Sequence, residues 1–405
     1  MINPPEQERT NDRLRLEVKK VLPQVIKLRH RLHQIPEASF QEKKTGELIR
    51  RELLSMNLDP EPVAQTGITV TLSGKHSENT LALRADMDAL AITELTGKTY
   101  TSQHAGYSHS CGHDGHMACV LGAARVLNEL KDQLFGKVKI IFQPAEEIGR
   151  GANAIITAGA LGTPLPAAIF ALHSWPGIPC KTLASRPGMI TAGNDLFTIT
   201  ITGKGGHGAR PHESNNPILT ASRIACEISS LAETKKERRP LYTISVGILQ
   251  GGTQPNTIPD TALLQGTLRS ADPDIRQKML TRISDRVKML CEKCGSHANI
   301  QFQTYCPPVL NNPDLYQLFS SAAKELLGPE NVTKLSTHSM GSEDFGCYTE
   351  KIPGLLIRLG MGTQSPTLHT SEFDFSDDAL ETGITILSGL ALRAGQPDCH
   401  IRNNA

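Results

Sequence analysis

Apolar residues recur along the first half of the chain at two alternating spacings. Helical spacing covers residues 14–32, 43–57, 114–131 and 152–158. Short apolar runs of strand length cover residues 68–72, 80–85, 138–143 and 167–172. Strands that alternate with helices in this order predict an α/β domain with a mostly parallel sheet flanked by helices on both faces.

The pattern changes after Pro187-Gly188. Residues 195–203 alternate apolar and polar side chains, as in a strand with one solvated face. Asn216-Pro217 and Asp272-Pro273 are typical helix starts, and further strands are predicted at 241–249 and 261–268. We therefore expect an α+β domain over residues 188–307, inserted into a discontinuous α/β domain.

The first pattern resumes after Pro307-Pro308. A helix is predicted at 313–327, a strand at 354–359, and a last helix from Ser376. The α/β domain is therefore expected to comprise residues 1–187 and 308–405.

Composition narrows the class of protein. The 405 residues carry a formal net charge of +1 and only 4% aromatics, which argues against a nucleic-acid binder. No apolar run approaches the roughly 18 residues that span a bilayer, and the charged N-terminal segment lacks the apolar core of a secretory signal. Nine cysteines without a framework spacing suit a reducing compartment. We expect a cytoplasmic protein with a small-molecule partner and neither membrane nor nucleic-acid binding.

Potential metal ligands follow three predicted strands directly: Asp86 and Asp88, then Glu146 and Glu147, then His173. In open α/β sheets, ligands bind beyond the carboxyl ends of the strands. This placement predicts a polar site at that edge of the sheet.

The run His109-Ser-Cys-Gly-His-Asp-Gly-His116 is rich in ligand types. Cys111 and His113 are two residues apart, which suits a loop leading into the helix that follows. Taken alone, the pair is equally consistent with a buried thiol beside surface histidines. With Glu147, His173 and His369 at the ends of other elements, we interpret Cys111 and His113 as metal ligands. Mixed sulfur, nitrogen and oxygen donors favour Zn, Mn, Co or Ni over Ca or Mg.

Adjacent carboxylates at Glu146 and Glu147 point in different directions. One can bind a metal while its neighbour takes a proton from a water and later delivers it to a leaving amine. An isolated Glu-Glu is more often a solvated acidic pair at a helix start. Asp88 suits a carboxylate that fixes a metal-bound histidine, with simple turn chemistry as the alternative.

The inserted domain offers weaker candidates. The glycines of 203–208 allow close backbone approach at His207, although on spacing alone a flexible hairpin is the preferred explanation of that segment. Asn256 is a further polar candidate. Arg269 suits a substrate carboxylate, or otherwise a surface or interdomain salt bridge.

Eight ordered motifs carry a family resemblance. They are RADMDAL (84–90), HSCGHDGHMA (109–118), FQPAEE (142–147), ALHSWP (171–176), GKGGHGARPH (203–212), GGTQPNTIPD (251–260), GSEDF (341–345) and LHTSEFDF (368–375). Over residues 20–395 the chain resembles the metal-dependent aminoacylase and carboxypeptidase superfamily. Within it, the motifs are similar to the amidohydrolase branch that contains hippurate hydrolases, N-acetyl-diaminopimelate deacetylases and indole-acetyl-amino-acid hydrolases.

The resemblance implies hydrolysis of N-acyl amino acids and an inserted ferredoxin-like domain that acts as a lid and forms a homodimer. It implies two divalent metal ions, with Mn first and Zn, Co or Ni as alternatives, on Cys111, His113, Glu147, His173 and His369. Glu146 matches the general base, and Asp88 the carboxylate beside the metals. His207 matches a lid histidine that stabilises the oxyanion in a partner subunit, and Asn256 and Arg269 fall on substrate-binding lid segments. Ala91 departs from the branch, which usually has Pro there.

Two other functions remain open from the residues. Cys111 can act as a nucleophile with His113 or His116 as its base, although two residues of separation give poor mutual geometry. Alternatively, the chain is a non-catalytic dimeric ligand-binding protein that keeps the fold. Chelation, thiol alkylation and metal analysis distinguish the three hypotheses.

Overall fold

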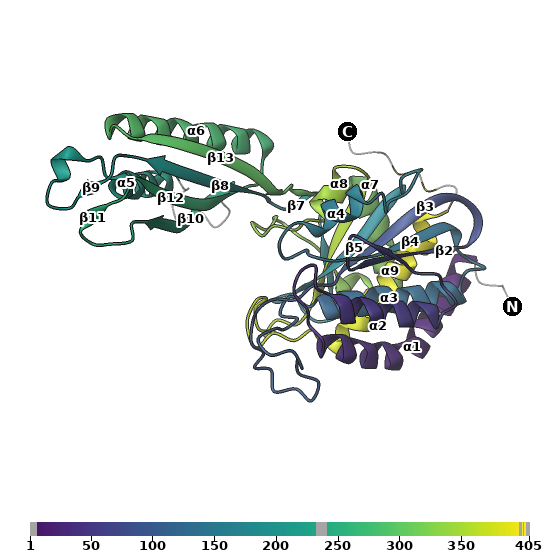
Figure 1. The fold of residues 1–405 in the computed structure, drawn as a ribbon. Coiled ribbons are helices and arrows are strands. Elements are labelled where there is room, and N and C mark those ends of the chain that lie inside the picture. The colour runs from purple at the N-terminus through teal and green to yellow at the C-terminus, as the bar shows by residue number, and fades with distance from the viewer. Residues whose placement is uncertain (1–5, 232–240, 397–398, 400, 402–405) are drawn as a thin grey trace. The chain divides into compact units, whose positions relative to one another are not determined.

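The computed structural model describes residues 6–231, 241–396, 399 and 401 (Figure 1). The chain divides into two compact units. Unit 1 comprises Met1–Ile190, Leu310–Ser336 and Asp344–Ala405, and unit 2 comprises Thr191–Val309 and Thr337–Glu343. Each unit has a hydrophobic core of its own.

Unit 1 is built on a sheet of ten strands. The strands are β1 (Glu61–Val63), β2 (Gly67–Ser73), β3 (Lys75–Asp86), β4 (Phe135–Gln143), β5 (Ala168–Trp175), β6 (Leu183–Ser185), β7 (Gly188–Thr191), β14 (Val309–Asn311), β15 (Val332–Lys334) and β16 (Gly354–Gly360). Their main order is β1-β2-β4-β3-β5-β16-β14-β7. The central strands β4, β3, β5 and β16 run parallel, while β2 is antiparallel to β4. The predicted mostly parallel sheet is confirmed.

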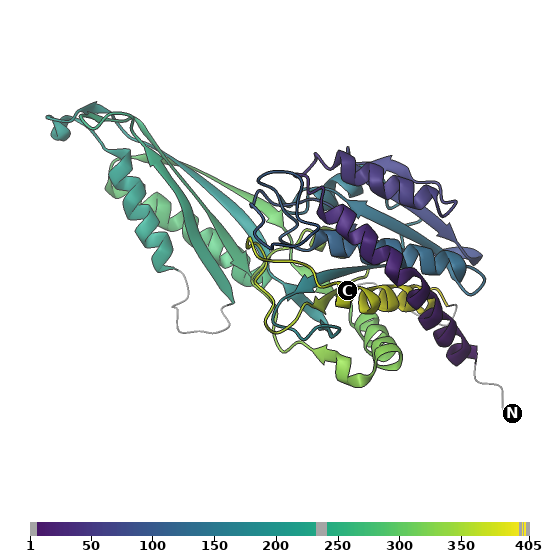
Figure 2. The same cartoon turned by 90° about the horizontal axis from the view of Figure 1, so that it is seen from below.

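Helices cover both faces of this sheet (Figures 1 and 2). They are α1 (Glu6–His33), α2 (Lys43–Leu54), α3 (His113–Glu129), α4 (Gly151–Thr157), α7 (Pro313–Leu327), α8 (Gly346–Thr349) and α9 (Leu380–Ala394), with 3-10 turns at Pro329–Asn331 and Asp377–Ala379. The central helix α3 contacts α1, α9 and the sheet. It is therefore buried on nearly all sides rather than on the single face that its apolar spacing predicts.

One strand boundary differs from the prediction. The apolar run predicts a strand that ends at Leu172, but β5 continues to Trp175 because β16 pairs with it up to Gly360. His173 therefore lies within β5 rather than beyond its end. Backbone pairing with a strand from the far end of the chain carries β5 past its apolar residues.

Unit 2 has the β-α-β-β-α-β order of a ferredoxin-like fold. Its elements are β8 (Gly193–Thr202), α5 (Pro217–Ser230), β10 (Tyr242–Gly251), β12 (Thr261–Ser270), α6 (Pro273–Lys293) and β13 (His297–Cys306). The antiparallel sheet has the order β10-β12-β8-β13. This topology confirms the ferredoxin-like expectation. The side chains of Asn216 and Asp272 accept hydrogen bonds at the starts of α5 and α6, as predicted.

A short ribbon extends unit 2. It consists of β9 (Gly206–His207) and β11 (Thr257–Ile258), followed along the chain from β9 by a 3-10 turn at Pro211–Glu213. Within the described part of the chain, no helix has the length and apolar character needed to cross a membrane. All nine cysteines are free thiols.

Candidate metal centre

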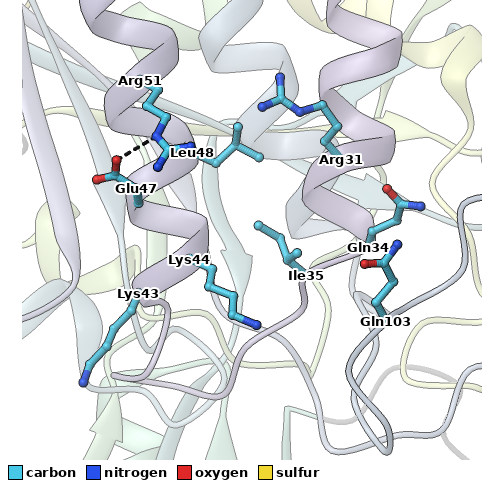
Figure 3. A pocket seen from close by; sticks show the side chains of 9 residues that line it. All are labelled: Arg31, Gln34, Ile35, Lys43, Lys44, Glu47, Leu48, Arg51 and Gln103. Carbon is cyan, nitrogen blue, oxygen red and sulfur yellow. Dashed lines mark hydrogen bonds and ion pairs between the residues drawn. The ribbon is translucent and has the colours of Figure 1, made fainter.

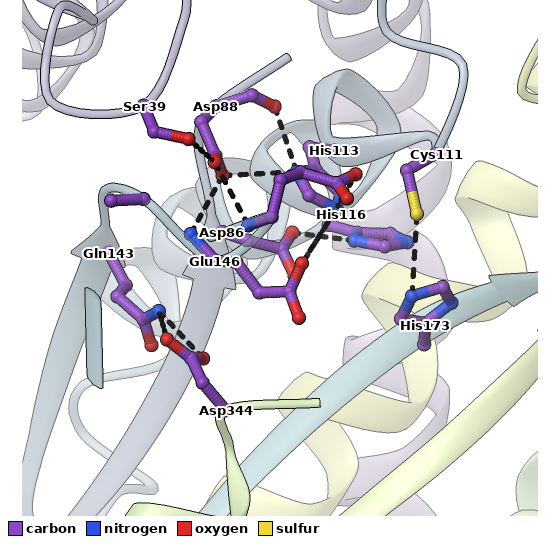
Figure 4. A network of polar contacts seen from close by, with 12 residues as sticks. Ser39, Asp86, Asp88, Cys111, His113, His116, Gln143, Glu146, His173 and Asp344 are labelled. Carbon is purple, nitrogen blue, oxygen red and sulfur yellow. Dashed lines mark hydrogen bonds and ion pairs between the residues drawn. The ribbon is translucent and has the colours of Figure 1, made fainter. Parts of the chain in front are cut away.

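The predicted polar site lies at one edge of the unit 1 sheet, where β3 and β4 end and α3 begins (Figure 4). Cys111 and His113 flank Gly112, which has a positive φ of 85°. A Cβ atom at residue 112 would lie 2.6 Å from the Ser174 hydroxyl oxygen. Glycine is therefore required at this turn, both for its backbone conformation and for its lack of a side chain.

The structure brings the five predicted metal ligands together in two groups that share Cys111. One group is Cys111, His113 and His173, and the other is Cys111, Glu147 and His369; in each, the ligand atoms lie within 4.8 Å of one another. Cys111 Sγ lies 3.6 Å from His173 Nε2. A Glu147 oxygen lies 3.8 Å from His113 Nε2, and its other oxygen lies 3.7 Å from His369 Nε2.

Backbone hydrogen bonds fix the two buried histidine rings. His113 Nδ1 donates to the Asp88 carbonyl, and His173 Nδ1 donates to the Ser174 carbonyl, each over 2.8 Å. The Nε2 atoms are thereby left as the atoms available to a ligand. His113 Nε2 is buried and has no hydrogen-bond partner among the described residues, which is the state that a bound cation would satisfy.

Asp88 connects this turn to the paired glutamates. Its carboxylate accepts the backbone N–H groups of Glu146 and Glu147, each over 3.0 Å, and the Ser39 hydroxyl over 2.7 Å. Burial alone would raise the pKa of Asp88, but the hydrogen bond with His113 outweighs burial and the pKa is lowered. One ionised carboxylate therefore positions both glutamates beside the His113 ring.

His369 reaches the site from a loop. Its backbone has a φ of 62°, which is strained for a residue other than glycine, and its N–H donates to the Ser110 carbonyl over 2.9 Å. Its side chain is 52% exposed. The loop thus holds the imidazole at the open side of the site, where a substrate can approach.

His116, which the sequence offers as a possible base for Cys111, is occupied by other contacts. Its Nδ1 donates to Asp86 over 2.7 Å, and its Nε2 accepts the Ser174 N–H over 2.7 Å. Arg84 in turn donates to Asp86 over 2.8 Å. His116 and Asp86 therefore support the neighbouring turn, and neither ring nitrogen is available to a metal.

The site's titration chemistry suits cation binding. Burial and then the Glu147 carboxylate raise the pKa of the Cys111 thiol well above its usual range. Burial raises the pKa of Glu147 to about 7 and lowers the pKa of His173 to about 3. His173 is consequently a neutral donor, whereas Cys111 needs a nearby cation to become a thiolate. A thiol in that state is a poor nucleophile, which weighs against the cysteine-nucleophile hypothesis.

The three candidates of the inserted domain lie in unit 2. His207 is exposed on β9 and pairs with Thr257, and the Asn256 carbonyl accepts the Gly208 N–H over 2.9 Å. The two glycine-containing segments of the sequence therefore lie side by side. Arg269 on β12 does not form the salt bridge considered from the sequence with any described residue. It donates instead to the Met340 carbonyl and the Ser342 hydroxyl, over 3.1 Å and 3.2 Å.

Several residues that support the site were not predicted from the sequence. Ser39 contacts Asp88, and the Ser174 hydroxyl donates to the Cys111 carbonyl over 2.7 Å. Asp344 accepts hydrogen bonds from Gln143 (Figure 4) and from Arg84. For Asp344, the signal in the sequence is the GSEDF motif, which the resemblance matched without assigning it a role. For Ser39, no local pattern distinguishes it from an ordinary turn residue.

A separate depression of about 480 Å³ lies on unit 1 between α1, α2 and the loop at Gln103 (Figure 3). Arg31, Lys43, Lys44 and Arg51 line it, with Glu47 paired to Arg51 over 2.7 Å. Neither cysteine nor histidine lines this depression. This depression therefore lacks the cysteine and histidine donors that gather at the sheet edge.

Comparisons with known proteins agree with this geometry. Residues 82–393 match peptidase family M20/M25/M40. The chain is 35% identical to N-acetylcysteine deacetylase of Bacillus subtilis, over 91% of this chain and 96% of that protein. It is 34% identical to IAA-amino acid hydrolase ILR1-like 4 of Arabidopsis thaliana, over 91% of this chain and 85% of that protein.

A solved structure has the same fold over nearly the whole chain. The YXEP protein of Bacillus subtilis, described as a dinuclear metal binding peptidase from the M20 family, superposes with a TM-score of 0.81 at 32% identity. The match covers 92% of this chain and 98% of that one. The similarity therefore includes both units.

Proposed function

Because the chain belongs to peptidase family M20/M25/M40, we propose that it is a metal-dependent amidohydrolase that cleaves N-acyl amino acids into a carboxylic acid and a free amino acid. Two relatives, named as an N-acetylcysteine deacetylase and as an IAA-amino acid hydrolase, support this substrate class. The observation that carries the proposal is the convergence of Cys111 with two separate sets of donor atoms, of which only the His369 side chain is exposed.

We assign two divalent ions to these donors. Cys111, His113 and His173 would hold one ion, and Glu147 and His369 with the shared Cys111 would hold the other. Manganese is our first assignment, with Zn, Co or Ni as alternatives. Divalent ions supply positive charge beside the substrate carbonyl oxygen and bring the pKa of a bound water to about 7. The dinuclear description of the YXEP protein supports two ions in place of one.

Glu146 is assigned as the general base. Its carboxylate lies 3.9 Å from His113 Nε2, and its backbone N–H is fixed by Asp88. The carboxylate takes one proton from the attacking water as the new C–O bond forms at the amide carbon. It then gives that proton to the nitrogen as the C–N bond breaks, so the amine leaves neutral and Glu146 is again ionised.

We further propose that unit 2 acts as the lid and dimerisation domain. His207 would stabilise the developing oxyanion in the partner subunit, and Asn256 and Arg269 would bind substrate. The exposure of His207 and its backbone proximity to Asn256 support a joint role. Arg269 uses Nη1 for its bonds within unit 2 and faces no described carboxylate, so its charge remains available to an anion.

The deciding experiment compares wild type with Glu146→Gln. Apoprotein is supplied in turn with Mn, Zn, Co and Ni and assayed on N-acetyl, N-benzoyl and longer N-acyl amino acids. Glu146→Gln should retain bound metal but lose roughly 100- to 10,000-fold in kcat. Glu350→Gln, which alters an exposed glutamate of the same unit, serves as the matched control. Normal turnover by Glu146→Gln with full metal content contradicts the base assignment.

Two outcomes would favour the other hypotheses. Turnover that survives chelation but is lost when iodoacetamide alkylates Cys111 would identify a thiol nucleophile. Tight ligand binding with neither metal nor turnover would identify a binding protein. Equilibrium sedimentation of the wild-type protein tests the homodimer separately.

A further inference from the structure

Arg358 in β16 is a buried arginine without an acidic partner. Its residue is 6% exposed, and no carboxylate among the described residues pairs with it. One guanidinium nitrogen, Nη2, donates to the Ile190 carbonyl over 3.3 Å, while Nε is buried with no hydrogen-bond partner in the described chain. A buried cation in this state is costly unless an anion reaches it.

The other buried arginines of the described chain behave differently. Arg29 donates to Asp114 over 2.8 Å, and Arg84 donates to both Asp86 and Asp344. Each of these guanidinium groups is therefore neutralised by carboxylates of the protein itself. Of the three buried arginines, Arg358 alone has no carboxylate partner among the described residues, and this difference requires an explanation.

Arg358 lies on the same face of the sheet as the metal centre. In the parallel pairing of β16 with β5, Arg358 is opposite His173, so both side chains leave the sheet on one face. Its guanidinium carbon lies 3.6 Å from the centre of the Trp175 ring, and the Trp175 and His173 ring centres are 5.8 Å apart. The Trp175 indole is therefore a neighbour of both Arg358 and a predicted metal ligand.

A second guanidinium, that of Arg186, adds positive charge near Arg358. Arg186 follows β6, the strand that pairs with β16 at Arg358, and its Nε is also buried without a hydrogen-bond partner in the described residues. Burial and then the charge of Arg186 lower the pKa of Arg358 to about 10. Two like charges held together in this way are stabilised by a negatively charged ligand.

We propose that Arg358, with Arg186 beside it, is a subsite that binds a carboxylate of the substrate. The planar fork of a guanidinium matches a carboxylate with two parallel hydrogen bonds, and stacking on Trp175 keeps that fork in one plane. The inference rests on the proposed function, because N-acyl amino acids carry an α-carboxylate and some carry a second one. The experiment distinguishes these two sources.

Three matched substrate pairs locate the carboxylate. N-acetyl-L-leucine and its carboxamide differ only in the α-carboxylate. N-acetyl-L-glutamate and N-acetyl-L-glutamine differ in the side chain, and N-succinyl-L-leucine and N-pentanoyl-L-leucine differ in the acyl group. For each pair, kcat/KM of the substrate that carries the carboxylate in question is divided by that of its partner without it, for wild type and Arg358→Met. Turnover of the partners without that carboxylate, in the same preparation, reports whether the variant is folded.

Arg358→Met should lower the ratio of one pair roughly 10- to 100-fold, as expected for loss of a charge-assisted bond. Arg358→Lys, which keeps the charge but loses the fork, should restore part of that loss. Arg13→Met removes an exposed arginine paired with Asp132 and should leave all three ratios at their wild-type values. Ratios for Arg358→Met that all stay within about twofold of wild type overturn the inference.

A binding measurement separates this inference from the hydrolase proposal. Trp175 is the single tryptophan of the chain and stacks on Arg358, so its emission should respond saturably to glutarate, a dicarboxylate without an amide bond. Arg358→Met should weaken glutarate binding roughly 10-fold or more at constant ionic strength. If none of the six amides is hydrolysed but this weakening occurs, the anion subsite stands and the hydrolase proposal fails. Equal glutarate affinity in both proteins counts against the subsite.

Discussion

Deprotonation of His33 should remove a stabilising charge from unit 1. His33 lies at the end of α1 with its side chain 1% exposed. Its Nδ1 lies 2.8 Å from Asp114, and its Nε2 lies 3.1 Å from Glu94, so each ring nitrogen faces a carboxylate. Only the doubly protonated ring can donate to both.

The sign of the effect follows from the pKa. Burial alone would lower it, but the charge of Asp114 and the hydrogen bonds to Asp114 and Glu94 raise the pKa of His33 from 6.5 to about 9. A raised value in the folded state means that the charged ring stabilises the fold fully below pH 6.5 and that this contribution is lost as pH rises through about 9. The gap between the two values corresponds to on the order of 3 kcal/mol.

Neighbouring groups do not titrate in the same window. Burial raises the pKa of Tyr100 to about 12 and lowers the pKa of His109 to about 3, so both stay neutral between about pH 6 and 10. Arg29 keeps its charge throughout, since the carboxylates around it outweigh its burial and raise its pKa. Among these four groups, His33 alone therefore accounts for the loss of stability expected between about pH 6 and 10.

The assay is urea unfolding followed by tryptophan emission, because Trp175 reports unit 1 alone. Wild type and His33→Gln are compared at constant ionic strength from about pH 6 to 10. The stability advantage of wild type over the variant should shrink by about 3 kcal/mol across this range. Metal binding and other titrations affect both proteins and cancel in the difference. An advantage that stays constant within about 0.5 kcal/mol would refute the assigned charge state.

Three further predictions concern the centre and the core beneath it. Asp88→Asn should weaken metal affinity roughly 10- to 100-fold in a chelator competition, because it disturbs the anchor of both glutamate amides; unchanged affinity contradicts this role. Asp344→Asn should lower the unfolding free energy of unit 1 by roughly 3 kcal/mol, since it removes one carboxylate from the buried Arg84; an unaltered urea midpoint would exclude it. Gly115→Ala should cost about 1–3 kcal/mol because its Cβ would lie 2.2 Å from the buried Phe375 ring, and a gain in stability would show that the ring can move.

Local patterns were sufficient for the class of the fold. The alternation of apolar runs and helical periods predicts the parallel sheet, and the change after Gly188 predicts a second kind of domain. Strands β1, β6, β14 and β15 have only three residues each, which is too short for any periodicity to appear. Their pairing is decided by strands distant in sequence, as is the extension of β5 past Leu172.

The candidate site shows the same division between local and distant information. The proximity of Cys111, His113, Glu146 and Glu147 could be predicted because donor residues cluster at the ends of local elements. The role of His116 could not, since Asp86 and the Ser174 amide, which occupy its two nitrogens, come from other strands. Arg358 lies inside an apolar strand run, so its sequence context does not reveal its unpaired charge.

The contacts around the centre indicate that its donors are positioned by the fold of unit 1. His113 is held by the Asp88 carbonyl, and the Asp88 carboxylate in turn fixes the two glutamate amides. Ser174 fixes Cys111 through its hydroxyl and His173 through its carbonyl. Because protein groups make these bonds, ion binding need not supply the energy that orders the site, unlike in small domains that fold only around their metal. Substitutions of the residues that hydrogen-bond to these donors should therefore weaken metal binding while unit 1 still folds.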